Sequence, residues 1–335
     1  MAKPVRWGIL STALIGRQKV IPAMKKSSML EVAAIASRDA GSARRVAEEL
    51  GIPTAHGSYE ALLADASIEV IYNPLPNHLH VPLTLQALQA GKHVLCEKPM
   101  ALNAAELEPL RPWATKLHVA EAFMVRFHPQ WIEVRERIRQ GEIGPLRMIN
   151  VAFSYFNEDA ANVRNRADIG GGALYDIGCY AIAAGRWFFE AEPERVIATF
   201  ERDPRFGTDR AASGVLDFGS GRQLAFGIAT QVAPYQRVQL IGTRGRIEIE
   251  IPFNAPQDAP CRYHVDATGA LDRSGQKIIT LPVHDQYQLQ AEAFSRQVRE
   301  SAPTSAGLDQ AVAQMRVIDA LFASERSGRF EAVAR

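Results

Sequence analysis

Short apolar runs alternate with helix-like stretches through the first 124 residues of the chain. The runs are rich in Val, Ile, Leu and Ala and end at small or turn-forming residues, which is typical of buried strands. We expect such strands at residues 5–10, 31–37, 69–73, 93–97 and 117–123. Helices are expected between them, over residues 40–50 and 81–90, from about Ile15 with a bend at Pro22, after a cap at Ser58, and from Asn103. This alternation predicts an α/β Rossmann domain with a doubly wound parallel sheet.

From residue 125 onward the pattern changes to a succession of strands. An amphipathic helix over residues 129–140 and an apolar helix over 173–189 flank a long alternating strand at 146–156. Further strands are expected at residues 195–201, 211–218, 223–232, 238–242, 246–251, 261–266 and 277–281, with closing helices at 286–300 and 309–324. We therefore expect a dinucleotide-binding domain over 1–124. The rest, 125–335, should be a substrate-binding and oligomerisation domain of the α+β class, with a large, mainly antiparallel open sheet.

The outer face of that second sheet is expected to need a cover. Its strands contain many apolar residues, and helices are expected on one face only. We therefore predict self-association through this face, as a homodimer or homotetramer.

Composition and charge exclude several classes of protein. The 335 residues are 47% hydrophobic, and 38 basic side chains balance 37 acidic ones, so neither nucleic acid nor a membrane surface is an expected partner. No apolar run has the length of a membrane span, and the N-terminus leads directly into the first strand, so we expect no signal peptide. The three cysteines, at 96, 179 and 261, lack metal-ligand spacing. They predict reduced thiols in a cytoplasmic protein without a metal.

The turn after the first strand has the frame of a phosphate-binding loop. It reads Ser11-Thr12-Ala13-Leu14-Ile15-Gly16, with Ser11 and Ala13 where the Gly-x-Gly-x-x-Gly fingerprint has glycines. Small residues still allow backbone amides to approach a pyrophosphate. Ser11 to Ile15 are therefore candidate cofactor ligands, and the alternative is an ordinary strand–helix turn.

The end of the second strand bears on the choice between NAD and NADP. An NAD enzyme usually has Asp or Glu here for the ribose diol, whereas this chain has Ser37 and Arg38. An arginine suits a 2′-phosphate, so we favour NADP over NAD, with Ser37 and Arg38 as ligands. The alternative is a solvated Arg38, with Asp39 serving the ribose.

The loop after the third long strand, Asn73 to His80, is expected at the carboxyl edge of the same sheet. Pro74 and Pro76 should hold it rigid. The expected cofactor contacts in this loop are Asn73, Leu75, Asn77 and His80. Each histidine of the loop, taken alone, is better explained as a residue at a helix start than as a catalytic one.

Three side chains carry the candidate chemistry. Lys98 follows a parallel strand, at the edge where such sheets bind ligands. Asp176 and Tyr180 are four residues apart on an apolar helix and therefore share one face. A solvated lysine and a core tyrosine are the structural alternatives. A charged Asp176 on an apolar helix needs a partner, however, and Lys98 is the expected one.

These motifs together resemble the glucose–fructose oxidoreductase/inositol dehydrogenase (Gfo/Idh/MocA) family. The resemblance rests on residues 7–16, 36–39, 73–80, 93–102 and 170–180, which span most of the chain. It is strongest in Glu97-Lys98-Pro99 and in the glycine-rich run that leads to Asp176 and Tyr180. The branch with NADP-linked xylose dehydrogenases and dimeric dihydrodiol dehydrogenases matches best, since many other relatives have His where this chain has Tyr180.

The resemblance implies an NADP-dependent oxidoreductase acting on CH–OH groups of a sugar or polyol, or on a cyclic diol. Tyr180 would be the general acid/base, Lys98 would lower its pKa, and Asp176 would orient Lys98 and the substrate. Glu97 and Lys98 would contact the cofactor. The expected substrate contacts are Phe123, Arg126, Phe156, Arg164, Asp176, Tyr180 and Tyr287, with Tyr155 as a weaker candidate.

Two other functions are compatible with part of this pattern. Some relatives use a tightly held NAD to cleave glycosides through transient oxidation, but Arg38 favours NADP. A catalytically silent NADP-binding sensor is the second alternative, and the intact set of Lys98, Asp176 and Tyr180 disfavours it.

Overall fold

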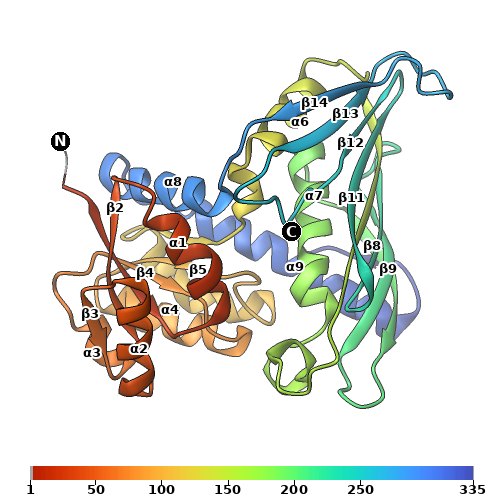
Figure 1. Cartoon of the computed structure of the whole chain (residues 1–335). Coiled ribbons are helices and arrows are strands. Elements are labelled where there is room, and N and C mark those ends of the chain that lie inside the picture. The colour runs from red at the N-terminus through yellow and green to blue at the C-terminus, as the bar shows by residue number, and fades with distance from the viewer. Residues whose placement is uncertain (1–2, 335) are drawn as a thin grey trace. The chain divides into compact units, whose positions relative to one another are not determined.

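The apolar runs of the first 124 residues form a parallel sheet with helices packed against it. In the computed structural model, which describes residues 3–334, six strands of this part pair in the order β3-β2-β1-β4-β5-β6 (Figure 1). Every pair in this sheet is parallel. The strands are β1 (Val5–Leu10), β2 (Leu30–Ala36), β3 (Thr54–His56), β4 (Val70–Asn73), β5 (His93–Cys96) and β6 (Val119–Glu121). The order reverses between β1 and β4, which is where such sheets bind ligands at their carboxyl edge.

Local signals set most helix boundaries of this unit. The Asp39 carboxylate caps α2 (Ala40–Leu50), and Gly51 ends it with a φ of 58°. Ser58 caps α3 (Tyr59–Leu63), as predicted. The remaining helices here are α1 (Ile21–Met24), which follows a π-helical turn (Gly16–Val20), α4 (His80–Gln89) and α5 (Arg111–Ala114).

Two details of this unit go beyond the prediction. Asn103 caps a helix, as predicted, and that helix is a 3₁₀ segment (Ala104–Leu110) with Pro109 inside it. The strand β3 was not expected, since it is short and only half-buried and therefore has little apolar pattern.

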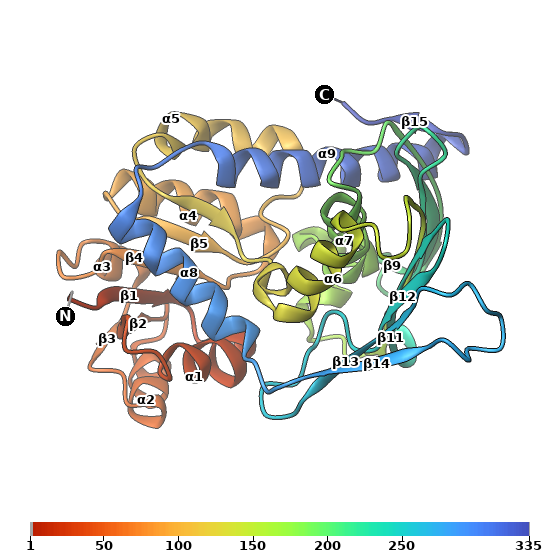
Figure 2. The same ribbon diagram turned by 90° about the horizontal axis from the view of Figure 1, so that it is seen from above.

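The first unit recruits a segment from the far end of the chain. The compact units are residues 1–124 with 285–312, and 125–284 with 313–335. Helix α8 (Gln286–Glu300) packs on α1, β1 and β2 (Figure 2). Trp7 of β1 donates a hydrogen bond to Ser295 of α8 across 3.0 Å, and its ring packs on Phe294. Residues 285–312, which the sequence pattern assigns to the second domain, therefore belong to the first. Helix α9 (Ala306–Ser327) begins in the first unit and continues in the second.

The second unit is built on a broad mixed sheet. In the described residues its nine strands run in the order β14-β13-β12-β11-β7-β10-β9-β8-β15. Only the β7–β10 pair is parallel among the pairings of this part, so the sheet is mainly antiparallel, as predicted. Its strands are β7 (Leu146–Phe156), β8 (Arg195–Arg202), β9 (Asp209–Asp217), β10 (Gln223–Ala229), β11 (Gln231–Gly242), β12 (Arg246–Ile249), β13 (Cys261–Asp266), β14 (Lys277–Leu281) and β15 (Glu331–Ala332).

Helices α6 (Pro129–Arg139) and α7 (Cys179–Phe189) lie on one face of this sheet (Figure 1). An aromatic core forms between them and the strands, in which Trp131 packs on Phe188 and Phe253 stacks on Phe153. Trp131 is fully buried, as expected. One predicted strand, residues 223–232, is in fact two, because the chain turns at Thr230 between β10 and β11.

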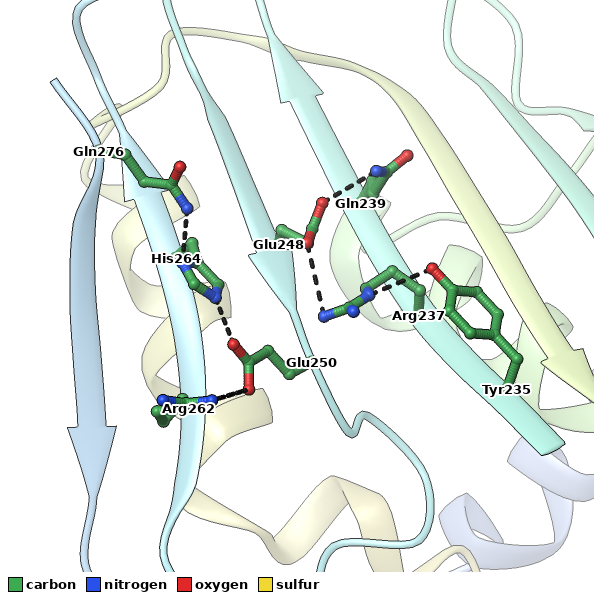
Figure 3. Close-up of polar contacts among 8 residues, drawn as sticks. All are labelled: Tyr235, Arg237, Gln239, Glu248, Glu250, Arg262, His264 and Gln276. Carbon is green, nitrogen blue, oxygen red and sulfur yellow. Dashed lines mark hydrogen bonds and ion pairs between the residues drawn. The ribbon is translucent and has the colours of Figure 1, made fainter. Parts of the chain in front are cut away.

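The opposite face of β11, β12 and β13 is polar (Figure 3). Glu248 contacts Gln239 at 2.9 Å and Arg237 at 3.4 Å, and His264 bridges Glu250 and Gln276. The apolar residues of these strands, including Val238, Leu240, Ile247 and Ile249, are buried on the helix side. The expectation that the outer face is apolar is therefore wrong for this part of the sheet. The large exposed apolar side chains on the strands of this unit are Met148, Phe156, Val232, Tyr235 and Ile278.

Residues 3–334 include no helix long and apolar enough to cross a membrane. The same residues hold no group of three or more His, Cys, Asp or Glu side chains that could bind a metal ion. Cys96, Cys179 and Cys261 are buried thiols. The cytoplasmic location, which was inferred from the cysteine content, stays a prediction.

Candidate active site

The turn after β1 adopts the backbone geometry of the glycine fingerprint without the glycine. Ser11 has a φ of 73°, in the left-handed region that glycine usually occupies. Its N–H donates to Ala36 O at 2.9 Å, and its Oγ accepts from Ala13 N at 3.3 Å. Thr12 Oγ1 lies 3.3 Å from Ser42 Oγ, and Leu14 is exposed. The side chain of Ser11 therefore stabilises the tight turn after β1, at the position where dinucleotide-binding folds approach a pyrophosphate.

At the end of β2, Asp39 and Arg38 have different surroundings. The Asp39 carboxylate accepts from Gly41 N at 2.9 Å and Ser42 N at 3.2 Å, so it is engaged in capping α2. Arg38 is exposed and interacts with the phenol of Tyr59. Burial raises the pKa of Tyr59, and the Arg38 guanidinium opposes that rise. This arrangement favours Arg38 over Asp39 as the residue that meets a cofactor ribose.

Glu97 and Lys98 follow β5, at the same edge of the sheet. Tyr72 donates to Glu97 Oε1 at 2.7 Å, and Lys98 N donates to Glu97 Oε2 at 3.3 Å. Tyr287 of α8 also lies near this carboxylate. Burial is the main cause that raises the pKa of Tyr287, and the negative charge of Glu97 raises it further. The structure thus groups Glu97, Lys98 and Tyr287 in the first unit. Tyr72 was missed, although its place beside Asn73 at a strand end could have indicated it.

Asn73, Leu75 and His80 lie in the loop after β4 and are buried. Their polar groups contact one another and the backbone, and Asn77 is half-buried beside them. Phe123 is 1% exposed and lies at the end of the first unit, after β6.

In the second unit, Asp176 is the centre of a polar cluster. Its Oδ2 accepts a hydrogen bond from Tyr155 OH at 2.6 Å and lies 2.8 Å from Arg164 Nε. The Asp176 carboxylate is the main cause that raises the pKa of Arg164, and Tyr180 also contributes. Burial and the same carboxylate raise the pKa of Tyr155, so its phenol stays protonated. Lys98 is the partner expected for Asp176 from the sequence, and the second unit supplies two further partners, Tyr155 and Arg164.

The glycine run before Asp176 holds Arg164 in place. Gly171 N donates to Arg166 O and Gly172 N to Arg164 O, both at 2.9 Å. A Cβ on Gly171 would lie 2.5 Å from Arg164 O, closer than any side chain can approach. Glycine is therefore required here for a backbone contact that sets Arg164 against Asp176.

Tyr180 lies in the first turn of α7 and is 5% exposed. Its ring packs on Phe253 and Phe153, with centroids 5.3 and 5.7 Å away. Arg126 is half-buried after a different strand, in the segment Met124–Phe127. Phe156 is 61% exposed, and strand alternation puts it on the face opposite to Tyr155. Of the two aromatic candidates on β7, Tyr155 is the one that contacts Asp176.

Asp209 is a buried carboxyl that the sequence did not single out. It accepts from Leu174 N at 2.6 Å, at the start of the π-helical turn (Leu174–Gly178) that carries Asp176. Burial raises its pKa to about 7. Asp209 and Leu174 are 35 residues apart, so only the fold could reveal the contact.

Comparison with known proteins assigns the family. Residues 5–127 match the model of the oxidoreductase family with an NAD-binding Rossmann fold, and residues 131–248 match the GFO/IDH/MocA C-terminal domain. An uncharacterized oxidoreductase of Rhizobium meliloti is 45% identical over 98% of this chain and 99% of its own length. The chain belongs to the Gfo/Idh/MocA family of oxidoreductases. The predicted resemblance is thereby confirmed.

Other members of the family are similar over three quarters or more of the chain. The D-xylose 1-dehydrogenase (NADP(+)) 2 of Haloferax volcanii is 39% identical over 96% of this chain and 98% of its own. A trans-1,2-dihydrobenzene-1,2-diol dehydrogenase of Xenopus tropicalis is 35% identical over 75% of this chain and 77% of its own. Both belong to the predicted branch.

Solved structures agree with the fold. A 3-ketoreductase from Actinomadura kijaniata in complex with NADP and TDP-benzene superposes with a TM-score of 0.87 at 29% identity, covering 96% of this chain and 98% of its own. An aldose-aldose oxidoreductase from Caulobacter crescentus gives 0.88 at 26% identity, covering 98% and 99%.

Proposed function

We propose that this oxidoreductase uses NADP to transfer hydride between the cofactor and a CH–OH or carbonyl carbon of a sugar, polyol or cyclic diol. The observation that carries the proposal is the cluster that Tyr155 of β7 and Arg164 form around Asp176, in the π-helical turn that leads into the helix of Tyr180. Carbohydrate hydroxyls need several fixed donors and acceptors for orientation, and this cluster provides them.

The first unit fits NADP in two features. The left-handed Ser11 gives the tight turn for the pyrophosphate, and the exposed Arg38 offers a guanidinium for a 2′-phosphate. NADP, when bound, supplies the hydride acceptor or donor. Ser11 to Ile15, Ser37, Arg38, Asn77 and Glu97 would hold it, with Asn73, Leu75 and His80 shaping the loop after β4. The NADP-bound ketoreductase and the NADP-linked xylose dehydrogenase support this choice.

Tyr180 would accept the hydroxyl proton in oxidation and return it in reduction. Lys98 would favour the phenolate of Tyr180 and stabilise developing alkoxide charge. Because Tyr155 stays protonated as a donor to Asp176, it would orient the carboxylate and leave proton transfer to Tyr180. Structures of the similar ketoreductase include variants with one tyrosine or one lysine replaced, which fits a role for these two residue types.

The substrate proposal follows the relatives with named activities. Xylose, a dTDP-linked keto sugar and a dihydrodiol share adjacent oxygens on a ring, and Arg164, Asp176, Tyr287 and Arg126 are the polar residues proposed to contact them. The named relatives are dehydrogenases and reductases, so neither glycoside cleavage nor a silent sensor is proposed.

The test is a substrate screen with both cofactors, followed at the nicotinamide absorbance. It includes aldoses, inositols, dihydrodiols and keto sugars, with wild type, Tyr180→Phe and Lys98→Met. We expect NADP-linked turnover that falls by about 10² to 10⁴ in Tyr180→Phe. Near-normal turnover in both variants, on a good substrate, would contradict the assignment.

We also propose that the polar outer face of the second sheet pairs with a second copy of the chain. The face combines fixed charges such as Arg237 and Glu248 with exposed Met148, Phe156 and Tyr235, a mixture typical of protein interfaces. Light scattering after size exclusion should give a dimer or tetramer, and Met148→Lys should shift it toward monomer. A wild-type monomer at micromolar concentration would contradict this proposal.

A further inference from the structure

A buried network ties the loop after β4 to the turn that carries Lys98. Asn73 and His80 are the polar side chains of this network, at 0% and 1% exposure, and both lie in the first unit. A polar group so deeply buried is stable only when its hydrogen bonds are satisfied. The partners of these two side chains therefore show what the network holds together.

His80 stands between two peptide carbonyls from different loops. Its Nδ1 lies 2.7 Å from Pro99 O, and its Nε2 lies 2.6 Å from Leu75 O. Leu75 belongs to the loop between β4 and α4, and Pro99 directly follows Lys98 after β5. The ring of His80 therefore contacts both loops, which directly follow the neighbouring strands β4 and β5 at the carboxyl edge of the sheet.

Asn73 fixes the same loop from its other side. Its Oδ1 accepts from Leu75 N at 3.3 Å, and its Nδ2 donates to His80 O at 3.1 Å and to Thr84 Oγ1 at 3.3 Å. Both backbone groups of Leu75 are therefore held, its N–H by Asn73 and its C=O by the His80 ring. The loop has little freedom to move relative to β4.

The charge of the His80 ring is opposed by its surroundings. Burial lowers the pKa of His80 to about 4, and electrostatic interactions with Lys98 and His78 act in the same direction, while the Pro99 and Leu75 carbonyls favour the proton. At neutral pH the ring is therefore neutral and donates to one carbonyl at a time. The N–H of the ring bonds one of the two carbonyls, the other ring nitrogen only packs against the second carbonyl, and the ring adds no second positive charge beside Lys98.

We propose that His80 is a positioning residue, which joins the loop 74–79 to the Lys98–Pro99 segment and so sets where Lys98 stands at the cofactor site. This inference rests on the proposed NADP function. His80 does not itself need to touch cofactor, since its ring nitrogens contact backbone carbonyls. Its effect reaches the chemistry through Lys98, where a displacement of about 1 Å can cost roughly a hundredfold in rate.

The test compares His80→Leu and His80→Gln with wild type in NADPH binding, measured by fluorescence titration, and in kcat and KM. Leucine removes both ring nitrogens, whereas the glutamine amide keeps donors for the two carbonyls. We expect His80→Leu to weaken NADPH binding about tenfold and to lower kcat further. His80→Gln should recover most of the loss in both.

The matched control is His118→Leu. His118 is also buried, and its Nε2 contacts a backbone carbonyl, Ser301 O, at 3.1 Å, but it precedes β6 and so lies at the amino edge of the sheet. The proposal is supported if both leucine variants lower the melting temperature by a similar amount and only His80→Leu weakens NADPH binding. Unchanged NADPH affinity and kcat in folded His80→Leu would overturn it. Failure of wild type to bind NADPH would instead overturn the proposed function.

Discussion

The phenol of Tyr155 donates a hydrogen bond to the Asp176 carboxylate across 2.6 Å. The contact joins β7 to the π-helical turn before α7, and it reserves the proton of Tyr155 for that carboxylate. We therefore propose separate tasks for Tyr155 and Tyr180. Tyr155 holds the carboxylate, and Tyr180 is the one proposed to exchange a proton with the substrate.

Tyr155→Phe should therefore lower kcat/KM about 10- to 100-fold, since a hydrogen bond to a charged group contributes about 1.5–3 kcal/mol. The loss should be smaller than that of Tyr180→Phe, and the measurement is steady-state kinetics on one substrate. Tyr263→Phe is the control, because Tyr263 is a buried tyrosine with hydrogen bonds to Glu133 and Arg137. Equal losses in Tyr155→Phe and Tyr180→Phe would remove the distinction between their tasks.

Gly171→Ala should destabilise the fold by about 1–3 kcal/mol and lower activity as well. The added methyl group would meet the Arg164 and Arg166 carbonyls at 2.5 and 2.7 Å and push Arg164 away from Asp176. Gly227→Ala is the matched control, because its Cβ would meet only Ser213 Oγ at 3.8 Å. Urea unfolding and kinetics of both variants make the comparison. Wild-type stability in Gly171→Ala would show that the loop adapts without strain.

Arg38→Ala should lower the kinetic efficiency with NADP at least tenfold and leave that with NAD nearly unchanged, because only the 2′-phosphate loses a charged partner. Asp39→Ala should instead lower stability by about 1 kcal/mol through loss of the α2 cap, with the same cofactor preference. Initial rates with both cofactors decide between them. A cofactor preference that changes in Asp39→Ala but not in Arg38→Ala would instead indicate that the Asp39 carboxylate binds the ribose.

Asp209→Asn should change how stability depends on pH. The pKa of Asp209 is raised to about 7, so between about pH 4 and 7 the folded state binds a proton that the unfolded state releases. Wild-type stability should therefore fall as pH rises through this range, and the variant should lack that fall. We expect the variant to gain about 2 kcal/mol relative to wild type between pH 5 and pH 8 in urea titrations.

The control for this titration is Asp217→Asn. Hydrogen bonds from Gly219 N and Arg195 lower the pKa of Asp217. Its contribution to stability is therefore lost only when the pH falls below the ordinary pKa range of carboxyl groups. Its difference from wild type should stay constant from pH 5 to pH 8. An Asp209→Asn profile parallel to wild type would mean that this carboxyl is ionised throughout.

Local sequence patterns predicted the strands, helices and caps that depend on residues close together in the chain. The strands Val5–Leu10, Leu146–Phe156 and Cys261–Asp266 and the helix Gln286–Glu300 have the predicted bounds, because their burial follows a regular period. Caps at Asn103 and Ser58 were also found, since a side-chain cap is a local contact.

Contacts between distant residues could not be predicted in this way. On β7 the sequence gives no reason to favour Tyr155 over Phe156, because which of two adjacent residues faces Asp176 depends on strand register. Likewise, nothing near Asp209 in sequence indicates that it meets Leu174. The turn at Thr230 was hidden because apolar residues continue on both sides of it.

The dependence of β1 on α8 has a consequence for synthesis of the chain. Trp7 leaves the ribosome early, whereas Ser295 and Phe294, which cover its ring, arrive near the end of translation. In the nascent chain the indole of Trp7 therefore lacks these contacts until translation is nearly complete. A fragment of residues 1–124 should therefore be poorly soluble and prone to aggregation. Attaching residues 285–312 through a linker should restore its solubility.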